Sequence, residues 1–199
     1  MLNAREETLV WLATLASRPE YREELAAKLA EAKAREDVTR DEVYEVFLQQ
    51  YLFVGFPSAL EAMKALGRAW PDEDQKPARE VASYTGYLER GQQLYQTIYA
   101  KNAEVVRDEM MRLSPDLAAW AVIEGYGKTL SREGLDVKTR ELCIVGILTQ
   151  LGWQRQLFSH IMGALNVGAT KQQVTIAIEI GTHQRPEHLE RSLRLLDKA

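Results

Sequence analysis

Residues 139–170 contain two apolar segments separated by Gly152, and this pattern restricts the fold more than any other feature of the chain. We expect two helices, with Arg140-Glu141 opening the first and His160 in the middle of the second. With a rise of about 1.5 Å per residue, Glu141 lies about 16 Å before the break and His160 about 12 Å after it. An antiparallel helical hairpin would therefore bring the carboxylate and the imidazole to similar heights on facing helices.

The rest of the chain also carries helical signals, and strand-type alternation of apolar and polar residues is nearly absent. Ser114-Pro115-Asp116 fits a helix N-cap followed by proline at the first helical position. The segments that begin at Thr39 and Thr170 both fit the Ser/Thr-x-x-Glu/Gln capping box. The sequence therefore predicts an all-α fold.

Composition and charge exclude several classes of function. The chain has 199 residues and a net charge of -4, which argues against non-specific binding of nucleic acid. No apolar run reaches the roughly 18 residues that span a bilayer, and charges interrupt the first 21 residues where a signal peptide needs an apolar core. We expect a cytoplasmic protein without a membrane partner. Cys143 is the single cysteine, so no intrachain disulfide or Cys-x-x-Cys redox pair can form.

The order of these signals is repeated within the chain, which favours a degenerate internal duplication. Arg5-Glu6 opens an apolar helix, a break and a second helix follow, and Thr39 caps the third. The later part repeats this order from Arg140-Glu141 to Thr170, but only the later copy carries a histidine at the matching helix. We expect a diverged half-repeat over 1–70, a linker over 71–80 and a second domain over 81–199, with the two parts packed as one unit.

A series of motifs follows in chain order: Tyr87 and Gly91, Ser114-Pro115-Asp116-Leu117, the segment Leu135–Leu142, His160, Ala164-Leu165-Asn166, Gly168 and Thr170. This series resembles the carboxymuconolactone decarboxylase family, part of the AhpD-like superfamily. The resemblance covers residues 81–182 well and residues 4–70 partially.

The resemblance implies an internally duplicated AhpD-like helical bundle that assembles as homo-trimers or homo-hexamers. It also implies a choice between two chemistries. Decarboxylase members act without a cofactor on a dicarboxylate lactone from aromatic-compound degradation, whereas AhpD-like peroxidases use glutamate, a Cys-x-x-Cys pair and histidine. Glu141 and His160 match the glutamate and histidine, but Trp153 and Gln156 occupy the two cysteine positions. Peroxidase chemistry needs both thiols, so we do not expect it here.

The residues leave the roles of Glu141 and His160 open between catalysis and structure. A lone histidine on an apolar helix is often a satisfied buried residue, and a glutamate in a first helical turn offsets the helix dipole. In the catalytic alternative, His160 is a general acid or base and Glu141 orients it.

Four further residues are candidates for substrate binding. Arg140 and Arg155 could hold a substrate carboxylate through their two-pronged guanidinium groups, although such arginines more often form ion pairs. Trp153 and Gln156 could line the pocket. With three histidines and no tight ligand spacing, we expect no metal site.

The sequence thus favours a cofactor-free lyase that acts on a small carboxylated lactone or a related organic acid. The alternative is a non-catalytic oligomeric helical assembly or interaction protein with the same fold.

Overall fold

The computed structural model describes residues 1–72 and 83–199, and every regular element in these two ranges is a helix. The predicted all-α fold is therefore confirmed for this part of the chain. Most of the predicted linker, residues 73–80, lies outside the described residues.

The chain divides into two compact units, formed by residues 1–72 with 134–199 and by residues 73–133. The first and last parts of the chain thus belong to one unit. Residues 83–133 group apart from the segment that follows them, and the expected domain boundaries stay a prediction.

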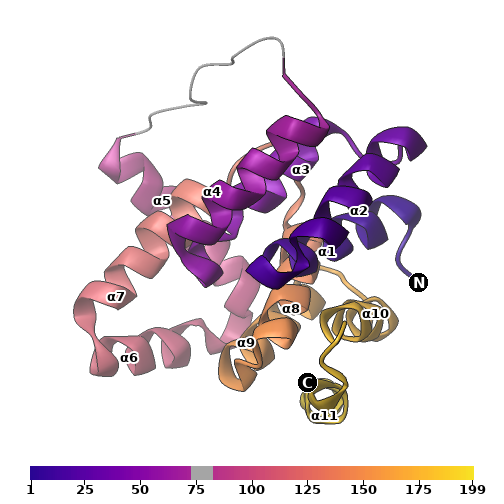
Figure 1. Cartoon of the computed structure of the whole chain (residues 1–199). Helices are drawn as coiled ribbons and strands as arrows, with labels where there is room; N and C mark the ends of the chain where they lie inside the picture. Colours follow the sequence, from indigo (N-terminus) through magenta and orange to yellow (C-terminus); the bar gives the residue numbers. More distant parts are fainter. Residues whose placement is uncertain (73–82) are drawn as a thin grey trace. The chain divides into compact units, whose positions relative to one another are not determined.

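The larger unit contains eight α-helices and two short 3₁₀ turns within its described residues. Figure 1 shows their course. They are α1 (Ala4–Ala16), η1 (Pro19–Tyr21), α2 (Arg22–Arg35), α3 (Arg40–Gln49), α4 (Tyr51–Ala69), α8 (Val137–Leu151), α9 (Gln154–Asn166), α10 (Lys171–Gly181), η4 (Pro186–His188) and α11 (Leu189–Asp197).

Helix α8 is the centre of this unit, because every residue from 139 to 150 is buried. It packs against α1, α9 and α10. Close approach of α1 is possible because Gly146 lacks a side chain; a Cβ there would lie 2.7 Å from Thr14 Oγ1. A helix covered on all sides needs apolar residues around its whole circumference, which explains the continuous apolar run in the sequence.

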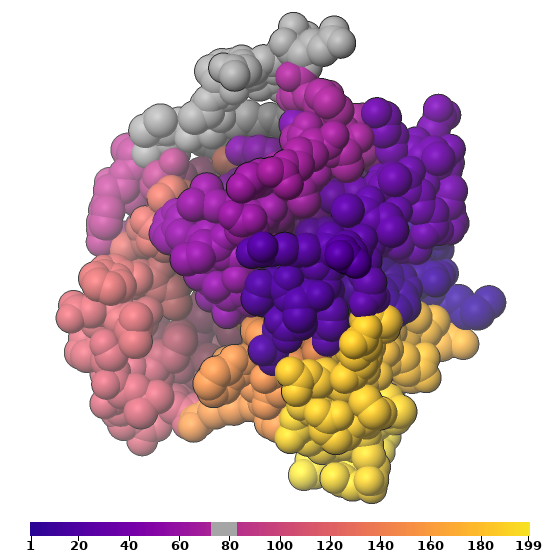
Figure 2. All heavy atoms as spheres, viewed as in Figure 1, coloured from indigo at the N-terminus to yellow at the C-terminus, as the bar shows by residue number. Residues whose placement is uncertain are grey.

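Helix α1 packs against α10, so early and late segments of the chain lie side by side in this unit, as the contact between indigo and yellow atoms in Figure 2 shows. The amino terminus donates a hydrogen bond to Gln172 Oε1 at 3.2 Å.

Arg5 donates to Glu42 Oε1 at 2.6 Å and pairs with Asp136 at 3.3 Å. Burial alone would raise the pKa of Glu42, but hydrogen bonds from Thr39 and Arg5 outweigh burial and hold this pKa below its ordinary value.

Both predicted capping boxes form, at Thr39 with Glu42 and at Thr170 with Gln173. They start α3 and α10, so the order of long helix, break, second helix and Thr-capped third helix occurs in both α1–α3 and α8–α10. Common descent of these two segments stays a prediction.

The smaller unit is described from residue 83 to residue 133. Its elements are α5 (Tyr84–Tyr99), η2 (Ala100–Asn102), α6 (Ala103–Leu113), α7 (Pro115–Trp120) and the π-helical segment η3 (Ala121–Leu130). Ser114 caps α7 through its side chain, and Pro115 occupies the first turn, as predicted.

Helix α5 and η3 approach each other at two glycines. A Cβ added at Gly91 would lie 2.1 Å from Val122 O, and one added at Gly127 would lie 1.9 Å from Tyr87 O. Real Cβ atoms do not come so close to backbone, so only glycine fits at either position. Beside this crossing, the hydroxyl groups of Tyr99 and Tyr126 lie 2.7 Å apart.

Candidate functional site

The break at Gly152 folds α9 back against α8, as the sequence predicts. Gly152 ends α8 in the left-handed conformation, with φ 77° and ψ 17°, and its backbone N–H donates to Leu148 O and Thr149 O. Glycine adopts this conformation at little cost. The hairpin places the central part of α9 beside α8.

Glu141 on α8 and His160 on α9 meet inside this hairpin. His160 Nδ1 lies 2.8 Å from Glu141 Oε2. The carboxylate can only accept a hydrogen bond, so Nδ1 carries the proton and Nε2 is the nitrogen left for other partners.

The surroundings of this pair are largely apolar. His160 is 7% exposed and Glu141 is 1% exposed. The ring of Phe53, on α4, packs edge-on against His160 with centroids 5.5 Å apart and an interplanar angle of 81°. Glu141 Oε1 is buried and has no hydrogen-bond partner within residues 1–72 and 83–199. Burial of a carboxylate oxygen without a hydrogen bond is unfavourable in free energy. A hydrogen-bond donor of a bound molecule would therefore be stabilised beside Oε1.

Gln156 lies one turn before His160 on α9, so these two side chains share a face of the helix. Trp153 is the residue directly before α9, and it is 60% exposed. Gln156 is also exposed, so this face changes from exposed at Gln156 to buried at His160. Arg155 is exposed as well, but it lies about 140° around the helix from His160, given roughly 100° per residue.

Arg140 points away from the pair and is bound within the fold. Its side chain is 1% exposed. Nη2 donates to Glu45 Oε2 at 2.9 Å, Nη1 to Gln49 Oε1 at 3.2 Å, and Nε to Leu135 O at 3.2 Å. This geometry favours a structural ion pair over the predicted contact with a substrate carboxylate.

Cys143, the single cysteine of the chain, is unsuited to thiol chemistry. Cys143 is fully buried in α8, and burial raises the pKa of its thiol well above the ordinary value. The thiolate is the reactive form of cysteine, so this side chain behaves as a small apolar residue.

The other two histidines have partners of their own. His183 Nε2 lies 2.6 Å from Glu24 Oε2, and His188 Nδ1 lies 2.7 Å from Thr149 O. Among the described residues, no group of three or more His, Cys, Asp or Glu side chains could hold a metal ion. No helix in the same residues is long and apolar enough to cross a bilayer.

Sequence reasoning missed the contributions of α3 and α4 to this region. Phe53 covers His160, and Glu45 neutralises Arg140. The chain offered one indirect signal, a glutamate within the apolar segment that ends at Phe47, because a charge in such a segment needs a partner.

Comparisons with known proteins identify relatives of this chain. The carboxymuconolactone decarboxylase family matches residues 116–182. Peroxisomal protein 2 of Schizosaccharomyces pombe is 33% identical over 145 residues, which cover 68% of this chain and 67% of the relative. The uncharacterized 15.0 kDa protein in the nqo9-nqo10 intergenic region of Paracoccus denitrificans is 39% identical over 71 residues, which cover 35% of this chain and 53% of that protein.

Proposed function

The chain belongs to the carboxymuconolactone decarboxylase family, and from this premise we propose that it is a lyase-type enzyme that uses His160 and Glu141 for acid/base chemistry without a cofactor. Its proposed substrate is a small carboxylated lactone or a related organic acid. The observation that carries the proposal is the 2.8 Å contact between His160 Nδ1 and Glu141 Oε2 in an apolar setting.

The proposed chemistry assigns one role to each nitrogen of His160. Glu141 accepts a hydrogen bond from Nδ1–H and fixes the ring, so Nε2 is the atom that exchanges a proton with the substrate. Neutral Nε2 removes a proton from an acidic carbon, or protonated Nε2 delivers one to the carbanion or enolate that forms when carbon dioxide leaves. The carboxylate of Glu141 stabilises the positive ring in either direction.

The proposed substrate-binding residues lie on the exposed part of α9. Gln156 shares a face of α9 with His160, and Trp153 directly precedes the helix, so we assign both to contact with a small molecule that reaches Nε2. Arg155 is a weaker candidate because of its position around the helix. Arg140 is left out of the proposed binding set, because Glu45 and Gln49 already occupy its guanidinium.

The experiment compares His160→Ala with His183→Ala. Both variants remove the imidazole of a histidine–glutamate pair, but His183 pairs with Glu24 on another part of the unit. We expect His160→Ala to abolish carbon dioxide release from carboxymuconolactone while its circular dichroism spectrum stays unchanged, and we expect His183→Ala to keep the activity. Equal turnover by wild type and His160→Ala would refute the proposal.

A non-catalytic role in a helical assembly is the second candidate. The low exposure of His160 and the loss of both cysteines favour it. The large apolar side chains of Phe56 and Leu60 are exposed on α4, four positions apart and thus on one face. Such a face is suited to a second subunit, and we propose a homo-oligomer for either candidate function. Light scattering of Leu60→Glu tests this assembly, since a charge on the face would dissociate it.

The predicted cytoplasmic location stays a proposal. The S. pombe relative carries a peroxisomal name, and this name describes that protein.

A further inference from the structure

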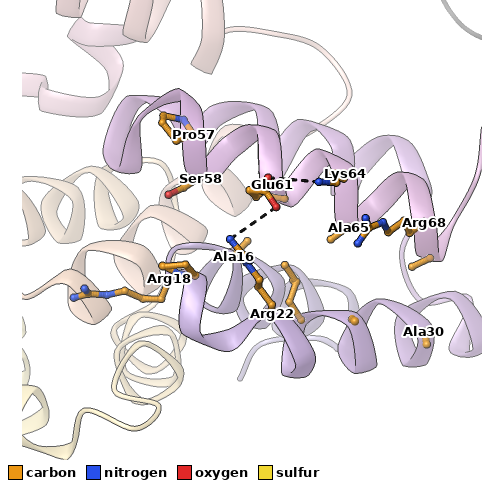
Figure 3. Close-up of a pocket in the computed structure, with 15 residues that line it drawn as sticks. Ala16, Arg18, Arg22, Ala30, Pro57, Ser58, Glu61, Lys64, Ala65 and Arg68 are labelled. Carbon is orange, nitrogen blue, oxygen red and sulfur yellow. Dashed lines mark ion pairs between the residues drawn. The ribbon is translucent and has the colours of Figure 1, made fainter.

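A pocket with a volume of about 540 Å³ lies between α2 and α4, at some distance along the chain from the proposed catalytic pair. Figure 3 shows the two helices along its opposite sides. All of its lining residues lie between positions 16 and 69, and they include neither Glu141 nor His160. The volume falls within the range of roughly 300–1,000 Å³ that is typical of small-molecule sites.

Small apolar side chains form most of the wall. The lining contains six alanines, one leucine and two prolines. On α2, Ala26 and Ala30 are one turn apart, and Ala65 and Ala69 repeat this spacing on α4. The methyl groups on both helices form an apolar part of the wall, which suits an aliphatic chain.

The charged residues of the wall are mostly basic. Four cations, Arg18, Arg22, Lys64 and Arg68, accompany a single carboxylate from Glu61, which leaves a net charge of +3. Figure 3 shows Glu61 between Arg22 and Lys64, with contacts of 3.9 Å and 3.8 Å. One carboxylate shared by two cations leaves most of the positive charge uncompensated.

Arg18 lines one end of the pocket, and Figure 3 shows its guanidinium pointing away from the other lining residues. Its Nη2 donates a hydrogen bond of 3.4 Å to Gln150 O on α8. Arg22, Lys64 and Arg68 are therefore the lining cations that an anion in the pocket would contact.

We propose that this pocket binds an amphipathic anion, with an aliphatic body against the alanines and a carboxylate or phosphate head beside the arginines. Both head groups fit the planar donor set of arginine. This ligand site is separate from the acid/base pair, so it does not depend on the proposed enzymatic function.

Titration calorimetry of the full chain tests the proposal with octanoate and octyl phosphate. Binding of either anion supports the site, and the one that binds more tightly identifies the head group. Octylamine, acetate and inorganic phosphate, which lack either the negative charge or the chain, should bind at least about tenfold more weakly, because each forfeits one of the two contributions.

Paired variants connect binding to the pocket. Arg22→Gln and Arg68→Gln should each lower the affinity for octanoate or octyl phosphate by about threefold to tenfold. The effect is modest because charge-assisted hydrogen bonds at partly exposed positions contribute little binding free energy. Lys33→Gln removes a cation from the exposed face of α2 outside the pocket and should leave the affinity unchanged. Ala26→Phe should block the pocket, whereas Ala27→Phe, one position along the same exposed surface, should not.

The same titration with His160→Ala separates this proposal from the enzymatic one. Unchanged affinity in that variant is expected, whatever its turnover. The proposal is wrong if neither anion gives a heat of binding at millimolar concentration. It is also wrong if octylamine binds as tightly as the two anions. A change in subunit count with Ala26→Phe, without binding of either anion, would instead assign the pocket to contact between two copies of the chain and would also overturn it.

Discussion

Removal of Glu45 should destabilise the protein severely, because it would leave the charge of Arg140 buried without its carboxylate. Arg140 is 1% exposed, Glu45 is 0% exposed, and their charged groups lie 2.9 Å apart. Loss of one partner of such a pair typically costs about 3–5 kcal/mol. The free energy of unfolding of an ordinary domain is about 5–15 kcal/mol, so Glu45→Leu should remove at least about a fifth of it. Urea denaturation followed by circular dichroism measures this difference.

Two controls show whether the unpaired charge is the cause. Glu124→Gln breaks an ion pair with Lys128 whose side chains are about half exposed, and it should cost less than about 1 kcal/mol. The double variant Glu45→Leu/Arg140→Met removes both charges and should recover most of the stability that Glu45→Leu loses. A loss below about 1 kcal/mol in Glu45→Leu would refute this account and would reopen a role for Arg140 outside the fold.

Three further predictions use the same structure. Cys143 should resist alkylation by iodoacetamide in the native protein and react fully in urea, which mass spectrometry can follow; rapid native labelling would contradict its burial. Gly127→Ala should lower the free energy of unfolding by about 3 kcal/mol through overpacking, whereas Gly125→Ala, whose added Cβ meets no atom within 4 Å, should be tolerated; equal urea midpoints for the two variants would count against the close helix crossing. Because the pKa of Glu42 is lowered by folding, its contribution to stability is present above its ordinary pKa and disappears as pH falls through the lowered value, so Glu42→Gln should reduce the loss of stability between pH 7 and pH 3.

The helical hairpin and its central contact were predictable from the sequence. Gly152 ends one apolar segment, and the distances of Glu141 and His160 from it are similar, so an antiparallel turn brings them together. These are local features of spacing and backbone conformation. The prediction therefore needed no knowledge of the remaining helices.

The orientation of Arg140 was not predictable in the same way. Adjacent residues on a helix point about 100° apart, so Arg140 and Glu141 cannot both face α9. Its partner Glu45 lies 95 positions earlier in the chain, and a single sequence carries no signal for such a long-range pair. The pocket between α2 and α4 was not predictable for the same reason, because it depends on how two separate helices pack.

The crossing of α5 and η3 at Gly91 and Gly127 has a mechanical consequence for the smaller unit. The two backbones touch without intervening side chains, so a shift of either helix by one residue would drive a Cβ into the opposite peptide. The close contact therefore holds the two helices in a single register at this crossing. Tyr99 belongs to α5 and Tyr126 to η3, so the same register also sets the 2.7 Å distance between their hydroxyl groups.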